Sequence, residues 1–411
     1  MRYNIFIGVL IICSLVNIGF NGENKLPHNI VMLIPEDRAQ KAIAIFSQHV
    51  LAYNDLKIQI EPYSNTHGLL QKLRDKNAKP NTSCIIVGDQ HYTAELAENK
   101  KILPLDHFID KEKEFLDQFE SPFLSHSYWH NEIYSLPLLQ QNHLLFYNKS
   151  AINQSLDACN NHFPDNWNDF DSLLDNFPTQ KDPRVAPLII PHDFYANVLL
   201  GCLSLRNDKV IIDTNKAGSI LHFWHKNYQK NNIYIPERAV LTVNNFLAGN
   251  ANFLCASSSV LSSINLDKHT FNNNFVVANT LTNNYNQTQL NRLNISISSN
   301  TPDTLQLPIW NFILSLYSLE CQKELCSNTG HIPVTKTLFR NEPFCRAEVQ
   351  SLYYESFENL AAPQLSFQHR EYSKILSILE KNVTDVIKDK ISIAQGIQNI
   401  EKQLPYVKNK K

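Results

Sequence analysis

The chain has 411 residues, which is too long for one ordinary core and long enough for two lobes of typical domain size. Hydrophobic residues make up 43% and charged residues 18%, a globular composition that excludes a disordered chain. The formal net charge is -2, so no strong field favours nucleic acid or an anionic membrane as a partner.

The N-terminal segment predicts export. Arg2 supplies a positive charge. Residues 5–12 form an apolar run that extends to Phe20, and the polar stretch 21–25 follows. This order is typical of a secretory signal peptide. The apolar run is also shorter than the roughly 20 residues of a membrane span. We therefore expect residues 1–22 to be a cleaved signal peptide and the mature protein to be periplasmic, with an uncleaved anchor as the alternative.

The next segment alternates between short apolar runs and helical periodicity. Strands are predicted over 29–34, 56–62 and 84–88, with helices over 38–51 and 69–76. Such alternation predicts a parallel sheet covered by helices. Ligands of these sheets bind at the carboxyl ends of the strands. The candidate site residues at these ends are Glu36, Tyr63 and Asp89.

A second lobe is predicted after the apolar segment 136–148, which we interpret as a strand crossing between the lobes. Residues 155–230 are mostly helical by pattern, and strands are predicted at 253–256 and 275–278. The serines at 257–259 stand between a strand and a predicted helix. They could present hydroxyls and helix N–H groups to an anion, or simply cap the helix.

The pattern as a whole predicts an α/β fold of two lobes, each a mixed sheet covered by helices. We expect lobe 1 to span 23–135, with 275–332 returning to it. Lobe 2 is expected to span 136–274, with 333–411 returning to it. The closing helices are predicted over 308–326, 372–386 and 392–404.

Catalytic and metal-binding signatures are missing from the sequence. It contains no GxSxG elbow, P-loop or HExxH motif, and only 10 glycines. The pairs His126/His130 and His222/His225 each offer two ligands, which do not close a metal site. We therefore expect neither an enzyme nor a cofactor or metal.

The cysteine count favours buried thiols over a disulfide framework. Eight cysteines are present, and seven remain when Cys13 of the apolar leader is set aside, so at least one is unpaired or bonds between chains. Cys321 and Cys326 are five residues apart, an offset that does not favour bonding on a helix. No CxxC spacing occurs.

Four short motifs, in chain order, carry a resemblance to a known family. Leu136-Pro137 followed by 145–149 (LFYNK) is similar to an "LP…YYNK" crossover, and 164–170 (PDNWNDF) to a "P-x-T-W-x-E-L" helix start. Residues 246–253 (FLAGNANF) are similar to "F-x-x-G-x-A-A-M", and 329–336 (TGHIPVTK) to "TGYLPVxK". The chain thus resembles family 1 extracellular solute-binding proteins of ABC importers, and most of all the glycerol-3-phosphate-binding subclass.

The resemblance implies a two-lobed type II periplasmic binding protein fold. In such proteins solute binds in the cleft, the lobes close, and the closed form docks on membrane permease subunits that carry cytoplasmic ATPases. The implied function is that of a monomeric substrate-binding subunit for a small polar solute, such as glycerol 3-phosphate, a related phosphodiester or a sugar.

The chain departs from the subclass at its ligand-binding positions. Gln140-Gln141 occupy the place of a paired serine, and His331 occupies the place of a tyrosine. An expected phosphate-binding arginine has only Arg370 and Lys374 as nearby substitutes. These departures leave the exact ligand open.

The predicted ligand-binding set combines strand ends, crossover residues and family motifs. Its members are Glu36, Tyr63, Asp89, Gln140, Gln141, Ser257, Ser258, Gly330, His331 and Arg370. We favour an anionic ligand, because the serine cluster, His331 and the cation of Arg370 could all bind an anion. The alternatives are a receptor that signals to a sensor, a degenerate binder that has lost its ligand, and a periplasmic hydrolase on the same fold.

Overall fold

The protein is described here from a computed structural model. The described residues are 29–36, 45–47, 56–64, 66–77, 79, 81–112, 114–141, 143–149, 164, 167–177, 185–190, 198–206, 209–236, 239–258, 274–279, 291–341 and 368–404. The predicted signal peptide, and most of the helix predicted over 38–51, lie outside them.

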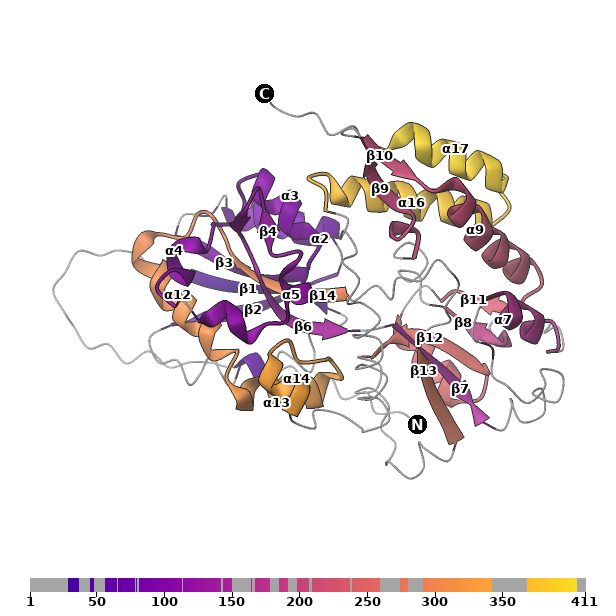
Figure 1. Ribbon diagram of the computed structural model, residues 1–411, viewed down its shortest axis with the longest axis horizontal. Helices are drawn as coiled ribbons and strands as arrows, with labels where there is room; N and C mark the ends of the chain where they lie inside the picture. Colours follow the sequence, from indigo (N-terminus) through magenta and orange to yellow (C-terminus); the bar gives the residue numbers. More distant parts are fainter. Residues whose placement is uncertain are drawn as a thin grey trace, which may run out of the picture.

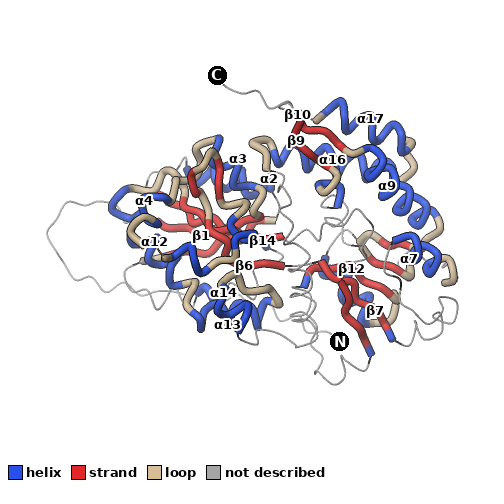
Figure 2. The backbone as a smooth tube through the Cα atoms, in the orientation of Figure 1, coloured by secondary structure: helices blue, strands red, loops and turns tan. Residues whose placement is uncertain are grey.

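The first sheet has five strands in the order β2-β1-β3-β14-β6 (Figures 1 and 2). β1, β2 and β3 are parallel, β14 is antiparallel to β3, and β6 is antiparallel to β14. Their bounds are Asn29–Pro35 (β1), Ile58–Tyr63 (β2), Thr82–Asp89 (β3), Asn291–Ile297 (β14) and Leu136–Gln141 (β6). The continuous apolar runs of β1 and β3 suit strands that are buried on both faces.

Two layers of helices cover this sheet. Alternate residues of β1 and β3 pack on one side against α2 and α3 and on the other against α12 and α13. The elements of this lobe are α2 (Thr66–Asn77), α3 (Tyr92–Glu98), α4 (Asp106–Ile109), α5 (Ser121–Leu124), α12 (Asp303–Ser315), α13 (Leu319–Thr329) and α14 (Lys336–Asn341), the 3-10 turn Phe115–Gln118, and the small pair β4 (Tyr128–Trp129) and β5 (Glu132–Ile133).

The second sheet also has five strands, in the order β11-β8-β12-β7-β13. β12 runs parallel to β8 and antiparallel to β7, so this sheet is mixed as well. Its strands are β7 (His143–Asn148), β8 (Leu188–Ile189), β11 (Ile233–Tyr234), β12 (Phe253–Ser257) and β13 (Phe275–Asn279), and its helices are α7 (Trp167–Leu174), α9 (Thr214–Gln229) and α10 (Ala239–Leu247). The predicted α/β fold of two mixed sheets is confirmed.

The last two helices join the lobes. α16 (Tyr372–Ile387) contacts α3 of the first lobe as well as α9 of the second, and α17 (Ile393–Gln403) packs on α16 and α9 (Figure 1). A hairpin of β9 (Leu203–Arg206) and β10 (Lys209–Ile212) lies beside α17. The C-terminal helices are therefore well placed to couple movement of one lobe to the other.

The chain crosses between lobes at different points from those expected. β13 pairs with β7 in the second sheet, so the described return to the first lobe begins with β14 and not at residue 275. α14 packs on α13, and Arg340 contacts Glu120, so residues 336–341 lie with the first lobe and not the second. Apolar periodicity identified the strand at 275–278 but could not say which sheet it joins.

Two other sequence interpretations were wrong in detail. The segment predicted as one helix over 308–326 is two helices, because Ser318 accepts a hydrogen bond from the Cys321 amide and starts α13 anew. The stretch 155–230, read as mostly helical, also contains strands β8, β9 and β10. Strands of two to four residues are too short to give a clear alternation.

Candidate functional site

Polar residues from four strands meet at one edge of the first sheet. Pro35 is paired with Tyr63, and Asp89 with Leu293, so the carboxyl ends of β1, β2 and β3 are level with the start of β14. β6 ends at the same edge, where Gln141 pairs with Asn291. The structure therefore places Glu36, Tyr63 and Asp89 along one edge, as expected for strand-end residues, and brings Gln140 and Gln141 of β6 to the same edge.

Tyr63 does not offer its hydroxyl to this edge. The side chain is buried, and its hydroxyl donates a hydrogen bond to the backbone carbonyl of Val87, at 2.9 Å. Glu36, by contrast, is exposed at the end of β1. Tyr63 therefore holds two strands together, while Glu36 is accessible to solutes.

Asp89 is held in place by the residues that follow it. Its Oδ1 accepts a hydrogen bond from the His91 amide at 3.0 Å and lies 2.6 Å from His91 Nδ1. The His91 ring stacks on Tyr372 of α16, with centroids 5.0 Å apart, and meets the edge of the His126 ring at 4.7 Å. The strand-end carboxylate is thus linked to the helix that joins the lobes.

Arg292 is a buried cation at this edge that the sequence analysis missed. It lies near the start of β14, donates from Nε to Gln90 Oε1, and places Nη2 3.2 Å from Ser125 Oγ. Burial lowers the pKa of Arg292 to about 9, and the negative charge of Asp89 partly opposes that effect. The alternation of 292–298 (RLNISIS) resembles a strand with one wet face, so nothing in the sequence marked this arginine as buried.

His126 is neutral beside this arginine. Its pKa is well below the usual value because it is fully buried and lies close to His91 and Arg292. Arg292 Nη2 approaches His126 Nδ1 at 3.3 Å, and a guanidinium can only donate. His126 Nδ1 therefore accepts, which places the imidazole proton on Nε2.

A second group of candidates meets where the chain crosses from one sheet to the other. Ser257, at the end of β12, donates from Oγ to Gln141 Oε1 at 2.6 Å, and pairs with His143 of β7. This bond joins the second sheet to the end of β6, which points toward it in Figure 2. Gln140 and Ile332 exchange two backbone hydrogen bonds of 3.0 and 2.6 Å at the same place.

Some buried polar atoms near this crossing have no protein partner among the described residues. Gln140 Oε1 and Ser258 Oγ are buried, and neither makes a hydrogen bond within the described part of the chain. Such groups cost free energy unless a ligand or water satisfies them. The helix predicted to follow the serines lies outside the described residues, so its N-terminus supports no argument about charge.

Gly330 and His331 lie beside Ile332 at the end of α13. Gly330 ends that helix in the left-handed conformation, with φ of 69°, which glycine adopts without strain. His331 is 1% exposed, and its Nδ1 is 2.8 Å from Thr329 Oγ1. Gly330 thus has a structural role, and His331 is in contact with the helix that precedes it.

The proposed cations each lie against a carboxylate. Arg370 Nη1 is 3.7 Å from Glu98 Oε1, and Lys374 Nζ is 3.5 Å from Glu371 Oε1. Glu98 also accepts from Trp129 Nε1, and these contacts lower the pKa of Glu98. Neither cation is therefore held ready for a ligand anion.

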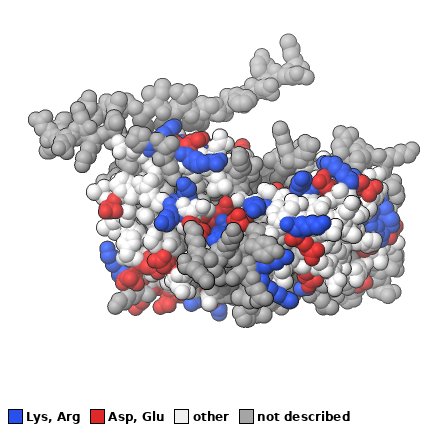
Figure 3. Space-filling model, turned by 90° about the horizontal axis from the view of Figure 1, so that it is seen from above, with Lys and Arg blue, Asp and Glu red and all other residues white. Residues whose placement is uncertain are grey.

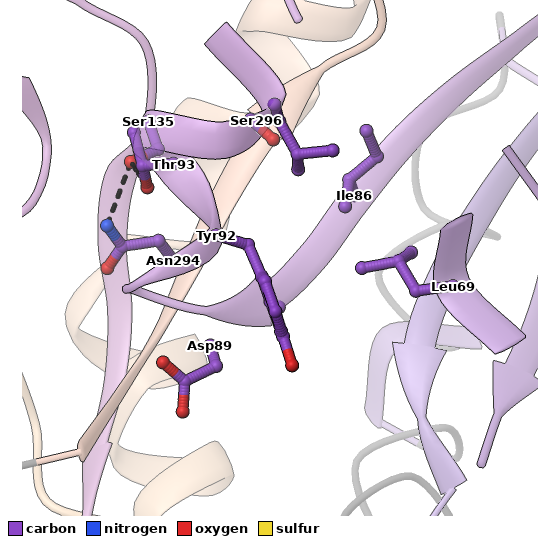
Figure 4. A pocket seen from close by; sticks show the side chains of 10 residues that line it. Leu69, Ile86, Asp89, Tyr92, Thr93, Ser135, Asn294 and Ser296 are labelled. Carbon is purple, nitrogen blue, oxygen red and sulfur yellow. Dashed lines mark hydrogen bonds between the residues drawn. The ribbon is translucent and has the colours of Figure 1, made fainter. Parts of the chain in front are cut away.

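One small cavity lies beneath the first-sheet edge (Figure 4). Its volume is about 10 Å³, and it is lined by Leu69, Ile86, Gly88, Asp89, Tyr92, Thr93, Leu96, Ser135, Asn294 and Ser296. This volume is about that of one water, so the cavity is not the solute site.

The described residues give no metal site or reactive thiol. No group of three or more His, Cys, Asp or Glu side chains among them could hold a metal ion. The described cysteines are all free and buried, as expected; they are Cys84, Cys202, Cys255, Cys321 and Cys326. In the same part of the chain, every helix is too short or too polar to span a membrane.

Charges are mixed on the face seen in Figure 3. Lys and Arg side chains lie among Asp and Glu over the described part of this face, without a large area of one sign. This agrees with the near-zero net charge of the sequence.

Comparisons with known proteins agree with this architecture. The family model described as "bacterial extracellular solute-binding protein" matches residues 41–349, more than half of the chain. The acarbose-binding GacH receptor of Streptomyces glaucescens GLA.O has a TM-score of 0.74 at 11% identity, covering 92% of this chain and 97% of that one. A comparison with curated protein sequences finds no match.

Two further solved structures are similar over nearly their whole length. Maltose-bound MalE3 of T. maritima has a TM-score of 0.71 at 16% identity, covering 91% of this chain and 98% of that one. UgpB of Mycobacterium tuberculosis, in complex with glycerophosphocholine, has a TM-score of 0.70 at 13% identity, with coverages of 92% and 97%. At such identities the likeness shows the fold alone.

Proposed function

The chain belongs to the family of bacterial extracellular solute-binding proteins, a non-catalytic family, and we propose that it binds a small polar solute in the periplasm for an ABC importer. The solute lies between the first-sheet edge and the end of β12. The observation that carries this proposal is the Ser257–Gln141 hydrogen bond, because it brings the polar ends of strands from both sheets together.

The solute class follows from the groups available at the crossing. Gln140, Gln141, Ser257 and Ser258 offer amides and hydroxyls, which suit the hydroxyl groups of a sugar or polyol. Arg370 and Lys374 already contact carboxylates, which weakens the case for an anion. A neutral polyhydroxylated solute is therefore our first choice. A glycerophosphodiester is the second, because UgpB shares the fold and Arg292 lies at the edge.

A binding screen tests this proposal. Maltose, maltotriose, glycerophosphocholine and glycerol 3-phosphate are each added in thermal-shift assays, and hits are measured by calorimetry. A solute present at 100 times its Kd should stabilise the protein by about 2.7 kcal/mol. Lactate, which lacks a polyol chain, is the control. Failure of all four solutes to shift the melting temperature or to give heat would contradict the proposal.

Variants then locate the solute. Gln141→Leu should weaken binding of the solute found in the screen by roughly tenfold, about the worth of one lost hydrogen bond. Lys374→Met, which changes a charge that already contacts Glu371, should bind as the wild type does. Equal binding by wild type and Gln141→Leu would place the solute elsewhere.

Transport is tested apart from binding. The purified protein with its solute should stimulate ATP hydrolysis by the matching permease reconstituted in vesicles. Binding without such stimulation by any permease of the source genome would favour a receptor that signals to a sensor.

A further inference from the structure

Asp89 and His91 differ in how accessible their side chains are. The Asp89 side chain is 20% exposed at the carboxyl end of β3, whereas the side chain of His91 is 8% exposed. Figure 4 shows the Asp89 carboxylate apart from Leu69 and Ile86, which are apolar residues of the small cavity. A solute at the first-sheet edge can therefore touch Asp89, while the protein itself covers most of His91.

His91 binds one oxygen of this carboxylate twice. The His91 amide donates to Asp89 Oδ1 at 3.0 Å, and His91 Nδ1 lies 2.6 Å from the same oxygen. A carboxylate oxygen can only accept, so His91 Nδ1 carries a proton and donates it. Two donors on one oxygen fix the side-chain torsions of Asp89. His91 thus sets the orientation in which the carboxylate meets a solute.

The His91 ring is itself held on two sides. It stacks on Tyr372 of α16, with ring centroids 5.0 Å apart and planes 13° from parallel, and it is T-shaped with His126 at 4.7 Å. Tyr372 is 1% exposed and His126 is 4% exposed, so both rings are enclosed by the protein. A densely packed interior leaves such a side chain few alternative rotamers. The packing therefore keeps His91 Nδ1 directed at Asp89.

The position of Tyr372 depends on α3. The Glu95 carboxylate accepts from the amide and the hydroxyl of Ser373, the residue after Tyr372, and the Tyr92 ring is T-shaped with Tyr372 at 5.1 Å. The rest of α16 also contacts α9 of the second lobe. The position of Tyr372, and through it that of His91, therefore depends on how α16 packs on the first lobe.

We propose that His91 is a positioning residue for solute binding. It does not touch the solute, but it holds the Asp89 carboxylate in the orientation that accepts a solute hydroxyl, and Tyr372 keeps it in place. This inference rests on the proposed function and extends it to residues that are hidden from the solute. It follows that the affinity of the first-sheet edge depends on the contact between α3 and the helix that joins the lobes.

A double-mutant cycle on solute affinity tests this, using calorimetry and the solute found in the screen. His91→Phe keeps a ring against Tyr372 but has no side-chain donor for Asp89, and it should weaken binding by about tenfold. Asp89→Ala should weaken binding at least as much. The double variant should bind as Asp89→Ala does, because His91 acts only through Asp89. His222→Phe, at an exposed position of α9, is the matched control and should bind as the wild type does.

Two results of the cycle would overturn the inference. One is wild-type affinity in either single variant. The other is a pair of losses that multiply in the double variant, because His91 would then act independently of Asp89. In both cases the wild type still binds its solute, so the proposed function would stand while this inference fails.

Crystal structures without solute give a second measurement. The Asp89 carboxylate should keep both contacts with His91 in the wild type and should turn to another rotamer in His91→Phe. An unchanged Asp89 rotamer would show that His91 does not position it, whatever the affinities are. If His91→Phe does not fold, Tyr372→Leu replaces it in both measurements, because it removes the ring on which His91 stacks. Tyr372→Phe, which retains that ring, should then restore the affinity lost in Tyr372→Leu.

Discussion

The electrostatics of the first-sheet edge depend on a few single residues, chiefly the buried cation of Arg292 and its neighbours Asp89 and His126. The guanidinium is buried with neutral acceptors around it. Burial lowers its pKa, and the negative charge of Asp89 partly opposes that effect. Buried charge of this kind is tolerated only while its partners stay in place. Protonation of the neighbouring His126 would add a second positive charge to the same volume.

Stability should therefore fall in mild acid. His126 has a native pKa below its unfolded value of about 6.5, so the unfolded chain binds more protons below that pH. The free energy of unfolding should decrease from about pH 6.5 down to the native pKa, by at most about 1.4 kcal/mol per pH unit for this group. Urea unfolding at a series of pH values between 7.5 and 5 measures this change in the free energy of unfolding.

The variant His126→Gln is the comparison for this experiment. Glutamine keeps an acceptor for Arg292 but does not titrate. The free energy of unfolding should therefore depend less on pH below pH 6.5 in the variant. His369, whose pKa burial also lowers, contributes the same sign and remains in the variant. Identical pH profiles for the two proteins would show that His126 is not the group responsible.

The buried thiols give a second prediction at this scale. Burial raises the pKa of Cys84 to about 11 and of Cys202, Cys255 and Cys321 to about 12, so almost no thiolate exists at neutral pH. Iodoacetamide at pH 8 should leave these four unmodified in the folded protein and label them in urea. Peptide mapping by mass spectrometry checks each one, and rapid labelling of Cys84 in the folded state would contradict its burial.

Among the elements, α16 depends on a residue from the other lobe for its first turn. Its own N-cap residue, Glu371, makes no side-chain capping bond. Instead the Glu95 carboxylate of α3 accepts from the Ser373 amide at 2.8 Å and from Ser373 Oγ at 2.6 Å. A carboxylate at this end is also favoured by the helix dipole. One side chain thus caps a helix and ties the lobes together.

Glu95→Ala should lower the free energy of unfolding by about 1–2 kcal/mol, because the cap and the dipole interaction are lost together. Denaturant titration measures the change. Glu401→Ala, in the exposed part of α17, makes the same substitution without a capping role and should be close to neutral. A loss at Glu95 no larger than at Glu401 would contradict the capping role.

At the scale of the whole molecule, two mixed sheets are joined through the β6–β7 crossing, the β13–β14 connection and the C-terminal helices. Few covalent links and a polar boundary favour hinge movement between lobes. Ligand binding shifts such an equilibrium only when the ligand binds one state more tightly than the other, which a solute that contacts both lobes of the closed form would do.

Solute binding should therefore make the protein more compact. Small-angle scattering with the solute identified in the screen should give a smaller radius of gyration than without it. A solute that the calorimeter shows to be non-binding is the control. Saturating binding with unchanged dimensions would show that the hinge mechanism is wrong.

The sequence alone determined the fold class, because apolar runs and helical periodicity are local signals. The predicted strands 29–34, 56–62 and 84–88 correspond to β1, β2 and β3 of the first sheet within a few residues. It also placed Glu36, Tyr63 and Asp89 at one sheet edge, since the carboxyl ends of parallel strands meet there. The ordered family motifs correctly indicated the solute-binding protein family to which the chain belongs.

Only the tertiary structure decided which polar groups are free to meet a solute. Arg370 and Tyr63 were candidates by position, but each has a partner from another element, Glu98 and the carbonyl of Val87. Arg292 and His126, far apart in the sequence, are brought together by packing that no local pattern encodes. The physical reason is that burial and charge pairing depend on which elements face one another, and a strand's alternation does not reveal what covers its polar face.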